Sequence, residues 1–382
     1  MTTTTQTLKN PMARAKKIVI KIGSAVLTQD SGELDLEFLK DLAAAVSKHM
    51  KAGKQILIVS SGAVASGRGT LGMMGKRKFS LSQKQALASV GQAKLMGIYS
   101  QVFAPYGISV GQILMTKDDL ENRLRDTNIR CTLDELLHLK CVPIINENDS
   151  TVVDELFGDN DTLASLVAAK VQAEAFIILS DVDGLFDKNP VLFDDAVLLP
   201  FVPTITKELI QSVTPPEFAK DTKFGTGGMK SKLRAAQYAS NEGVNVMIGN
   251  GKTRGCIDMM LSGKGGGTFF PAHQRRHNSR QQWLLAKKTR GSVMIDEGAA
   301  NAIMARQKSL LAAGVKGVEG TFKAGDVIAI TDMQGKVLGN GIMNYSSAEI
   351  TRIKGLPTAA IKRIVGERHY YEAVHHDDLA IY

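Results

Sequence analysis

A glycine-rich run with two lysines offers the clearest chemistry in this chain. Residues 225–232 read GTGGMKSK and lead directly into a helix-like stretch at 233–239. Glycines before a helix allow backbone N–H groups to close around an anion, and a lysine in the first turn adds positive charge where the helix dipole already favours phosphate. The run therefore predicts a nucleotide-phosphate site. Because it lacks the spacing of a Walker loop, an ordinary surface loop is an equally good interpretation of the run taken alone.

Further polar clusters stand at the ends of short apolar runs that we predict to be buried strands. The predicted strands cover residues 18–22, 56–59, 142–145 and 176–179, with two more at 108–114 and 244–248. The clusters are Lys21-Ile22-Gly23-Ser24, Ser60-Ser61-Gly62-Ala63, Asn146-Glu147-Asn148-Asp149 and Ser180-Asp181, and Gly158-Asp159-Asn160-Asp161 precedes a helical stretch. Open parallel sheets bind ligands beyond the carboxyl ends of their strands, so we expect these side chains to form one site.

Each cluster also has a purely structural interpretation. Lys21 taken singly is most simply a lysine on an edge strand, and Asp149, Asn160 and Asp161 suit helix caps. Capping and catalysis can coexist, and Asp161 is where we expect both.

The elements that position these clusters alternate between strand and helix. Apolar residues recur at helical spacing over residues 36–50 and 83–103. Connections of this length allow parallel pairing of the strands. The sequence predicts a three-layer αβα sandwich with a mainly parallel sheet.

Composition excludes several classes of protein. The chain has 382 residues, of which 44% are hydrophobic and 22% charged, as in ordinary globular proteins, and its length favours two domains. No apolar stretch is long enough to span a bilayer and the start lacks a signal-type segment, so we expect a cytoplasmic protein with no membrane partner and a flexible N-terminus over residues 1–15. The three cysteines, Cys131, Cys141 and Cys256, show no metal-ligand spacing and are expected to be free thiols.

The predicted secondary structure changes after the glycine-rich run at residues 262–267. No helix follows this run, so we interpret it as a turn or linker rather than a second phosphate loop. Short strands with turn signals then predict a small β-rich module. Residues 275–382 carry 16 Lys and Arg against 10 Asp and Glu, a net charge of +6 out of +9 for the whole chain. This excess favours either RNA binding or a solvated basic face, and the absence of an aromatic ladder favours the second.

Taken together, the clusters carry a family resemblance. In order and spacing, the motifs from Lys21 to Lys232 resemble the amino acid kinase family, and within it the glutamate 5-kinases. The tail, with Asp296-Glu297-Gly298-Ala299 and Gly325-Asp326-Val327-Ile328, resembles the PUA domain found in many of them. The resemblance implies a flexible start at 1–15, a kinase domain at 16–272, a linker at 273–290 and a PUA domain at 291–382.

The implied reaction transfers the γ-phosphoryl group of ATP to the side-chain carboxylate of L-glutamate, the first step of proline biosynthesis. That carboxylate is already ionised near neutral pH, so no general base is needed, and catalysis depends on alignment and positive charge. By resemblance, Lys21 contacts the transferred phosphate and Lys232 stabilises the transition state and the leaving group. Asp161 holds the two ammonium groups in place.

The resemblance also assigns the two substrate sites. Ser61 would meet the glutamate side-chain carboxylate, while Asn146, Asp149 and Asn160 would hold the amino-acid end, with Asp149 pairing with the ammonium. The nucleotide would be bound by Lys21, Ser180 and Asp181 together with the glycine-rich run, namely Thr226, Gly227, Gly228, Met229, Lys230, Ser231 and Lys232. Mg²⁺ would be held mainly by ATP phosphates and water, with no direct protein ligand assigned.

Regulation and partners follow from the resemblance alone. It implies inhibition by proline, assembly into homodimers or homotetramers, and passage of the product to glutamyl phosphate reductase. Two alternatives stay open: another specificity within the amino acid kinases, and an RNA-binding protein that acts through the PUA domain and carries a vestigial kinase domain. The presence of Lys21, Asp161 and Lys232 disfavours the vestigial interpretation.

Overall fold

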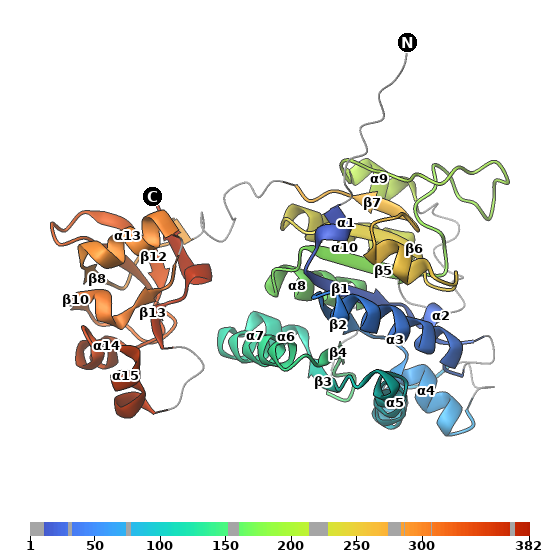
Figure 1. Cartoon of the computed structure of the whole chain (residues 1–382), viewed down its shortest axis with the longest axis horizontal. Helices are drawn as coiled ribbons and strands as arrows, with labels where there is room; N and C mark the ends of the chain where they lie inside the picture. Colours follow the sequence, from blue (N-terminus) through green and yellow to red (C-terminus); the bar gives the residue numbers. More distant parts are fainter. Residues whose placement is uncertain are drawn as a thin grey trace, which may run out of the picture. The chain divides into compact units, whose positions relative to one another are not determined.

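The computed structural model describes residues 11–382 except 30–32, 74–77, 152–159, 214–227, 274–283, 286, 307 and 367–370. The chain forms two compact units, Met1–Gln274 and Arg275–Tyr382 (Figure 1). Each unit has a hydrophobic core of its own.

A seven-stranded sheet organises the described part of the first unit, in the order β3-β4-β2-β1-β5-β6-β7. Its strands are β1 (Lys17–Ile22), β2 (Gln55–Val59), β3 (Val110–Met115), β4 (Val142–Glu147), β5 (Ala175–Ser180), β6 (Asn245–Asn250) and β7 (Thr268–Phe270). Neighbours from β3 to β6 pair in parallel, and only β7 pairs antiparallel, with β6. The predicted mainly parallel α/β sheet is therefore confirmed.

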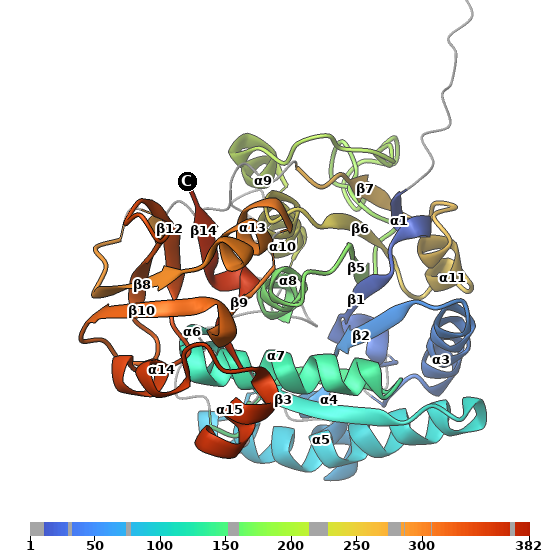
Figure 2. The same ribbon diagram turned by 60° about the vertical axis from the view of Figure 1, so that its left-hand side comes forward.

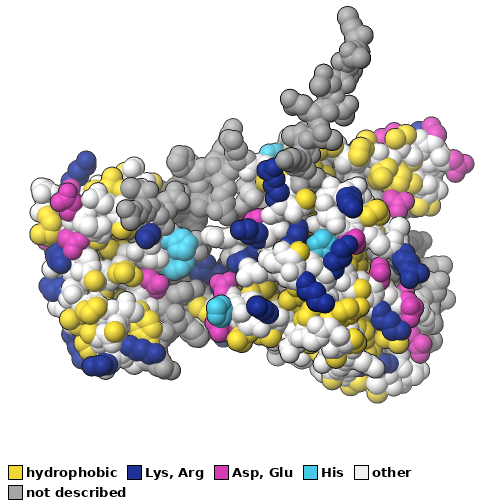
Figure 3. Space-filling model, in the orientation of Figure 1, with side chains coloured by type: hydrophobic (Ala, Val, Ile, Leu, Met, Phe, Trp, Pro, Cys, Tyr) yellow, Lys and Arg dark blue, Asp and Glu magenta, His cyan; other side chains and the backbone are white. Residues whose placement is uncertain are grey.

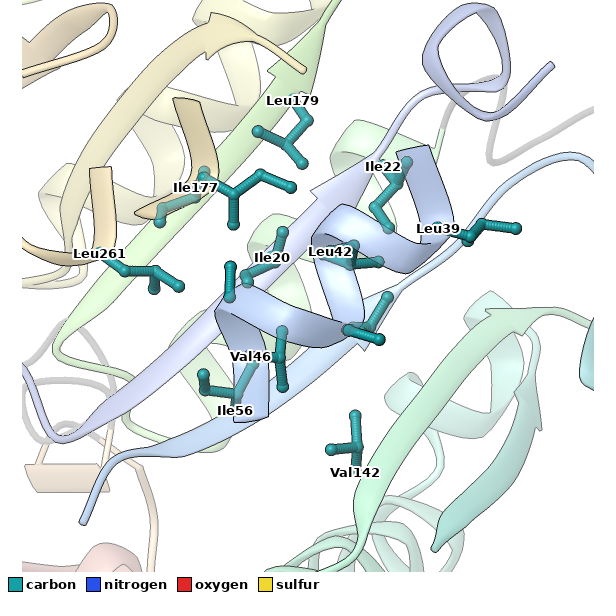
Figure 4. Packing of buried hydrophobic residues seen from close by; sticks show 14 of the residues in the cluster. Ile20, Ile22, Leu39, Leu42, Val46, Ile56, Val142, Ile177, Leu179 and Leu261 are labelled. Carbon is teal, nitrogen blue, oxygen red and sulfur yellow. The ribbon is translucent and has the colours of Figure 1, made fainter. Parts of the chain in front are cut away.

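Helices cover both faces of this sheet. One face packs against α1 (Pro11–Arg14), α2 (Ser24–Leu27), α3 (Leu36–Lys51), α5 (Leu81–Phe103) and α11 (Cys256–Leu261). Figure 4 shows side chains of β1, among them Ile20 and Ile22, against Leu39, Leu42 and Val46 of α3. The other face packs against α6 (Lys117–Glu121), α7 (Arg123–His138), α8 (Asn160–Lys170), α9 (Lys207–Ser212) and α10 (Met229–Asn241).

The long helix α5 begins two residues earlier than its apolar periodicity predicts. The Ser80 hydroxyl accepts a hydrogen bond from the Gln83 backbone N–H, and the Gln83 side chain accepts one from the Ser80 N–H. This capping box satisfies two backbone donors of the first turn. Helix α4 (Ala63–Thr70) lies against α5, as both ribbon views show (Figures 1 and 2), and a short 3₁₀ turn (Ala104–Tyr106) ends the segment.

The structure differs from the sequence-based expectation at the start of this unit. Within the segment expected to be flexible, Pro11–Arg14 forms α1, and the Met12 side chain is fully buried in the hydrophobic core. The Lys54 ammonium also donates to the Met12 and Ala13 carbonyls. The glycine-rich run at 262–267 is a turn, and it lies inside the unit because β7 follows it and joins the sheet. Gly265 and Gly266 adopt φ values of 112° and 101°, which favour glycine.

The described part of the second unit is β-rich and also contains helices. Its main sheet has the order β10-β8-β11-β12-β14 and contains β8 (Gly291–Ile295), β10 (Val315–Gly320), β11 (Val327–Thr331), β12 (Val337–Ile342) and β14 (Leu379–Ile381). A small second sheet pairs β9 (Leu310–Leu311) with β13 (Glu372–Val374). The helices are α13 (Glu297–Arg306), α14 (Ser347–Ile353) and α15 (Thr358–Val365), with 3₁₀ turns at Ala312–Gly314 and His376–Asp378. The β-rich character was predicted, whereas these helices were not.

Candidate active site

The predicted polar clusters gather at one edge of the first unit's sheet, at the carboxyl end of β1. This strand lies between β2 and β5, and Lys21 pairs with Val59 on one side and Ile178 on the other. Strands β2 to β4 extend the sheet in one direction and β5 to β7 in the other. The end of β1 is therefore the topological switch point, where sheets of this kind bind their ligands.

Alternation along β1 decides which way Lys21 points. Ile18, Ile20 and Ile22 enter the core shared with α3 and α5, whereas Val19 enters the opposite core, shared with α8 and α10. Because successive side chains of a strand point to opposite faces, Lys21 lies on the face of Val19. The helices α8 and α10 then supply its neighbours.

A buried Lys–Asp–Lys cluster forms at this point. The Lys21 Nζ lies 2.5 Å from Asp161 Oδ1, and the Lys232 Nζ lies 3.8 Å from Asp161 Oδ2. Lys21 is 4% exposed, Asp161 0% and Lys232 8%. With both lysines and the aspartate ionised, the cluster carries a net charge of +1, so it can attract an anion while the carboxylate holds the two ammonium groups in place.

Helix starts position the cluster. Asp161 is the second residue of α8, and Lys232 lies in the first turn of α10. The Ser231 hydroxyl donates to Asp161 Oδ2 at 2.8 Å and so links the two helices. Backbone N–H groups at the start of a helix add to the positive field around the lysines.

A second group of contacts, made by Asn160, joins three loops beside the lysines. Its Nδ2 donates to the Ser60 carbonyl at 2.9 Å, to Ser61 Oγ at 2.8 Å and to Asn146 Oδ1 at 3.2 Å. Ser60 and Ser61 follow β2, and Asn146 is the penultimate residue of β4. Gly62, at φ 91°, turns the chain from Ser61 into α4.

Two carboxyl groups of raised pKa lie beside this network. Burial, together with the charge of Asp149, raises the pKa of Glu147 to about 7, and burial also raises the pKa of Asp149. Both groups lie on the segment that begins at Asn146. A carboxylate that has lost part of its hydration is suited to receive a cation, such as an ammonium group of a ligand.

The residues predicted for the nucleotide are only partly within the described structure. Ser180 is buried at the end of β5 and donates to Asp181 Oδ1 at 3.1 Å. Gly228 caps α10, and Met229, Lys230 and Ser231 form its first turn. Thr226 and Gly227 lie outside the described residues. Of this run, Ser231 and Lys232 meet Asp161.

Sequence reasoning missed two polar residues on α5 that contact the site. The Gln92 Oε1 accepts a hydrogen bond from Asn146 Nδ2 at 2.9 Å, and the Tyr99 hydroxyl lies 2.9 Å from Ser60 Oγ. Burial raises the pKa of Tyr99 far above its ordinary value. The one available signal was the presence of polar side chains on the stripe of α5 that the apolar pattern assigns to the core.

The described residues offer neither a grouped set of metal ligands nor a helix suited to a membrane. In the parts of the chain that the structure describes, no three His, Cys, Asp or Glu side chains are grouped so that they could hold a metal ion. None of the described helices has the length and apolar character required to cross a bilayer.

Comparison with known proteins gives consistent matches over both units. Residues 16–250 match the amino acid kinase family and residues 291–365 match the PUA domain. A glutamate 5-kinase of Thermoanaerobacter sp. (strain X514) is 40% identical over 96% of this chain and 97% of its own length. The glutamate 5-kinase of Moorella thermoacetica is 42% identical over 97% of each chain. Among solved structures, an isopentenyl phosphate kinase aligns with a TM-score of 0.46 and 19% identity, covering 66% of this chain and 99% of that one.

Proposed function

The chain belongs to the amino acid kinase family and, within it, to the glutamate 5-kinases, and on this premise we propose that it phosphorylates L-glutamate. In this reaction a side-chain carboxylate oxygen of glutamate attacks the γ-phosphorus of ATP. The bond from that phosphorus to the β,γ-bridging oxygen breaks, and ADP leaves with the electron pair. The products are L-glutamyl 5-phosphate and ADP, and the reaction opens proline biosynthesis.

The observation that carries this proposal is the buried Lys21–Asp161–Lys232 cluster. Donor and acceptor are both anions, so their approach needs fixed positive charge, and phosphoryl transfer is catalysed chiefly by alignment and charge neutralisation. Lys21 would contact the transferred group, and Lys232 would stabilise the charge that develops on the leaving oxygen. Asp161 would keep both ammonium groups at fixed positions.

The neighbouring network suits an amino acid as the acceptor. Ser61 would meet the reacting carboxylate, and Asn146 and Asn160 would hold the α-carboxylate end. Asp149 would pair with the ammonium, which its partly buried carboxyl can accept. Ser180, Asp181 and the start of α10 would meet the nucleotide. Mg²⁺ would arrive with ATP, held mainly by its phosphates and by water.

ADP release with MgATP tests the proposal across four acceptors: L-glutamate, L-aspartate, N-acetylglutamate and UMP. Hydroxylamine traps an acyl phosphate, and Lys232→Ala serves as the inactive control. Turnover selective for glutamate and lost in the variant is the expected result. Selective turnover of another acceptor would overturn the assignment of the acceptor site while keeping the roles of the lysines, and no turnover by folded protein would overturn the proposal.

Regulation and assembly are further parts of the proposal. We expect proline to inhibit at or beside the glutamate site, the chain to form homodimers or homotetramers, and glutamyl phosphate reductase to receive the labile product. If millimolar proline leaves the rate at subsaturating glutamate unchanged, the first expectation fails.

RNA binding by the second unit stays a prediction. Its sequence carries a net charge of +6, but on the face in Figure 3 lysine and arginine side chains are interspersed with acidic and hydrophobic ones. A solvated basic surface accounts for this pattern. Binding of RNA that weakens steeply as salt rises would favour the alternative.

A further inference from the structure

Helix α5 presents polar groups to the loops of the acceptor site. Gln92 and Tyr99 are separated by seven residues, two turns of helix, and so lie on the same face. Gln92 contacts Asn146 at the end of β4, and Tyr99 contacts Ser60 at the end of β2. A single helix therefore holds two loops that both meet Asn160.

A third contact continues the same stripe of α5. Ser89 precedes Gln92 by three residues, and its Oγ lies 2.8 Å from Ser150 Oγ, next to Asp149. Ser89 and Ser150 are exposed, so this hydrogen bond competes with water and is weaker than the two buried ones. Ser89 and Gln92 therefore lie along the segment from Asn146 to Ser150, whereas Tyr99 meets the loop after β2 at Ser60.

Backbone groups fix the direction of the hydrogen bonds made by Asn146 and Asn160. The Glu147 backbone N–H donates to Asn146 Oδ1 at 2.9 Å, so the Asn146 oxygen must face it. The Asn146 Nδ2 consequently faces Gln92, whose Oε1 must be the acceptor. The Ser60 carbonyl can only accept, which orients Asn160 in turn. Gln92 thus accepts the hydrogen bond from Asn146 Nδ2, the end of the amide that does not contact the Glu147 backbone.

Packing alone does not account for a glutamine at this position. Gln92 is 8% exposed, and in the described structure its Nε2 is buried with no hydrogen-bond partner. Burying an unpaired amide costs free energy that an apolar side chain of the same size would avoid. The contact that offsets this cost is the one to Asn146.

We propose that Gln92 is a positioning residue for the acceptor: it orients the Asn146 amide, and through it Asn160 and the Ser60-Ser61 loop, for binding of the amino-acid substrate. This inference rests on the proposed function, because it assigns the acceptor site to these loops. Gln92 itself does not contact Lys21, Asp161 or Lys232 in the described structure. Its effect is therefore expected on acceptor binding rather than on ATP.

Two substitutions at Gln92 separate hydrogen bonding from packing. Gln92→Met keeps the length of the side chain but removes the acceptor for Asn146 Nδ2, whereas Gln92→Glu keeps an acceptor oxygen. Leu95→Ala is the control, since Leu95 is a fully buried residue of the same helix in the apolar core. Loss of one buried hydrogen bond predicts that Gln92→Met raises the KM for glutamate about tenfold and leaves the KM for ATP within about twofold.

The conservative variant and the control complete the test. Gln92→Glu should have a glutamate KM closer to wild type than Gln92→Met does. Leu95→Ala should lower the melting temperature with little change in either KM. A crystal structure of Gln92→Met, which needs no turnover, should show the Asn146 amide turned from its wild-type orientation, because, of its contacts to Glu147 and Gln92, only the one to the Glu147 backbone remains.

Distinct results overturn the inference and the proposed function. If Gln92→Met keeps both the wild-type glutamate KM and the wild-type orientation of Asn146, or raises both KM values equally, Gln92 has no positioning role. If the wild-type enzyme turns over a different acceptor, the proposed function fails while the comparison of variants proceeds with that acceptor. If wild-type protein is inactive with every acceptor, the crystal structure alone decides on Gln92.

Discussion

Replacing Asp161 by asparagine removes the negative charge between two buried ammonium groups. Asp161 is 0% exposed, with Lys21 Nζ at 2.5 Å and Lys232 Nζ at 3.8 Å. Removing one partner of a buried ion pair costs about 3–5 kcal/mol, because the remaining charge stays buried. In a unit of this size each kcal/mol lowers the melting temperature by about 2–4 °C, so a decrease of about 10 °C is expected.

The same change should slow catalysis. Without the carboxylate, the two ammonium groups repel each other and lose the geometry that neutralises the transferred phosphate. Loss of one preorganised electrostatic contact typically costs about 10²- to 10³-fold in kcat, and we expect a decrease of this size for Asp161→Asn. Inorganic phosphate should stabilise the variant more than the wild type, since the charge of the cluster rises from +1 to +2.

Asp134→Asn is the matched control. It breaks another Lys–Asp contact to β1, with Lys17 at 3.3 Å, but Asp134 is 59% exposed. Surface pairs contribute about 0–1 kcal/mol, so this variant should melt within about 2 °C of wild type and keep its kcat. Differential scanning fluorimetry and steady-state kinetics measure both variants. A shift below 1 °C for Asp161→Asn, or equal losses in the two variants, would refute the role of a buried ion pair.

Three further predictions follow from other contacts. Burial, with the charge of Asp149, raises the pKa of Glu147 from 4.5 to about 7 in the folded protein. Ionisation of Glu147 therefore opposes folding, and this cost in stability is absent below about pH 4.5 and complete above about pH 7. Glu147→Gln should therefore raise the melting temperature at pH 8 but not at pH 4.5, and equal shifts at both values would contradict this. In Gly91→Ala the new Cβ would lie 1.8 Å from the Ala63 carbonyl oxygen, so α4 and α5 must move apart. This change should lower the free energy of unfolding in urea by about 2 kcal/mol and raise the glutamate KM. An unchanged free energy of unfolding would show that the two helices can separate without loss of stability. Lys54→Met removes three hydrogen bonds to backbone carbonyls of α1 and α11, so stability should fall by about 2 kcal/mol with kcat unchanged, and a fall in kcat without loss of stability would count against a structural role.

A common site at this edge of the sheet could be predicted from the sequence by a general rule, whereas the pairing of Asp161 with Lys21 and Lys232 was implied by the family resemblance. Parallel strands share one carboxyl edge, so Lys21 and the polar residues after the other strands had to converge there. Asp161 and Lys232 begin helices, and helix starts meet at the same edge. This rule applies however far apart in the sequence the residues lie.

The contacts that α5 makes with the acceptor loops could not be predicted in the same way. Apolar periodicity assigns Gln92 and Tyr99 to the buried stripe of α5, but it does not say which strand ends that stripe faces. Their partners, Asn146 and Ser60, lie 54 and 39 residues away. Similarly, the spacing of the glycine-rich run did not reveal that Ser231 turns toward Asp161.

The alternation along β1 makes this strand sensitive to insertions and deletions. Ile18, Ile20 and Ile22 face one core, and Val19 and Lys21 face the other. Removing a single residue before Lys21 would shift the alternation, so that the ammonium would point into the apolar core and an isoleucine would face α8. Insertions and deletions that preserve catalysis should therefore be confined to the loops. In β1, deletion of a single residue should reduce activity more than most substitutions do.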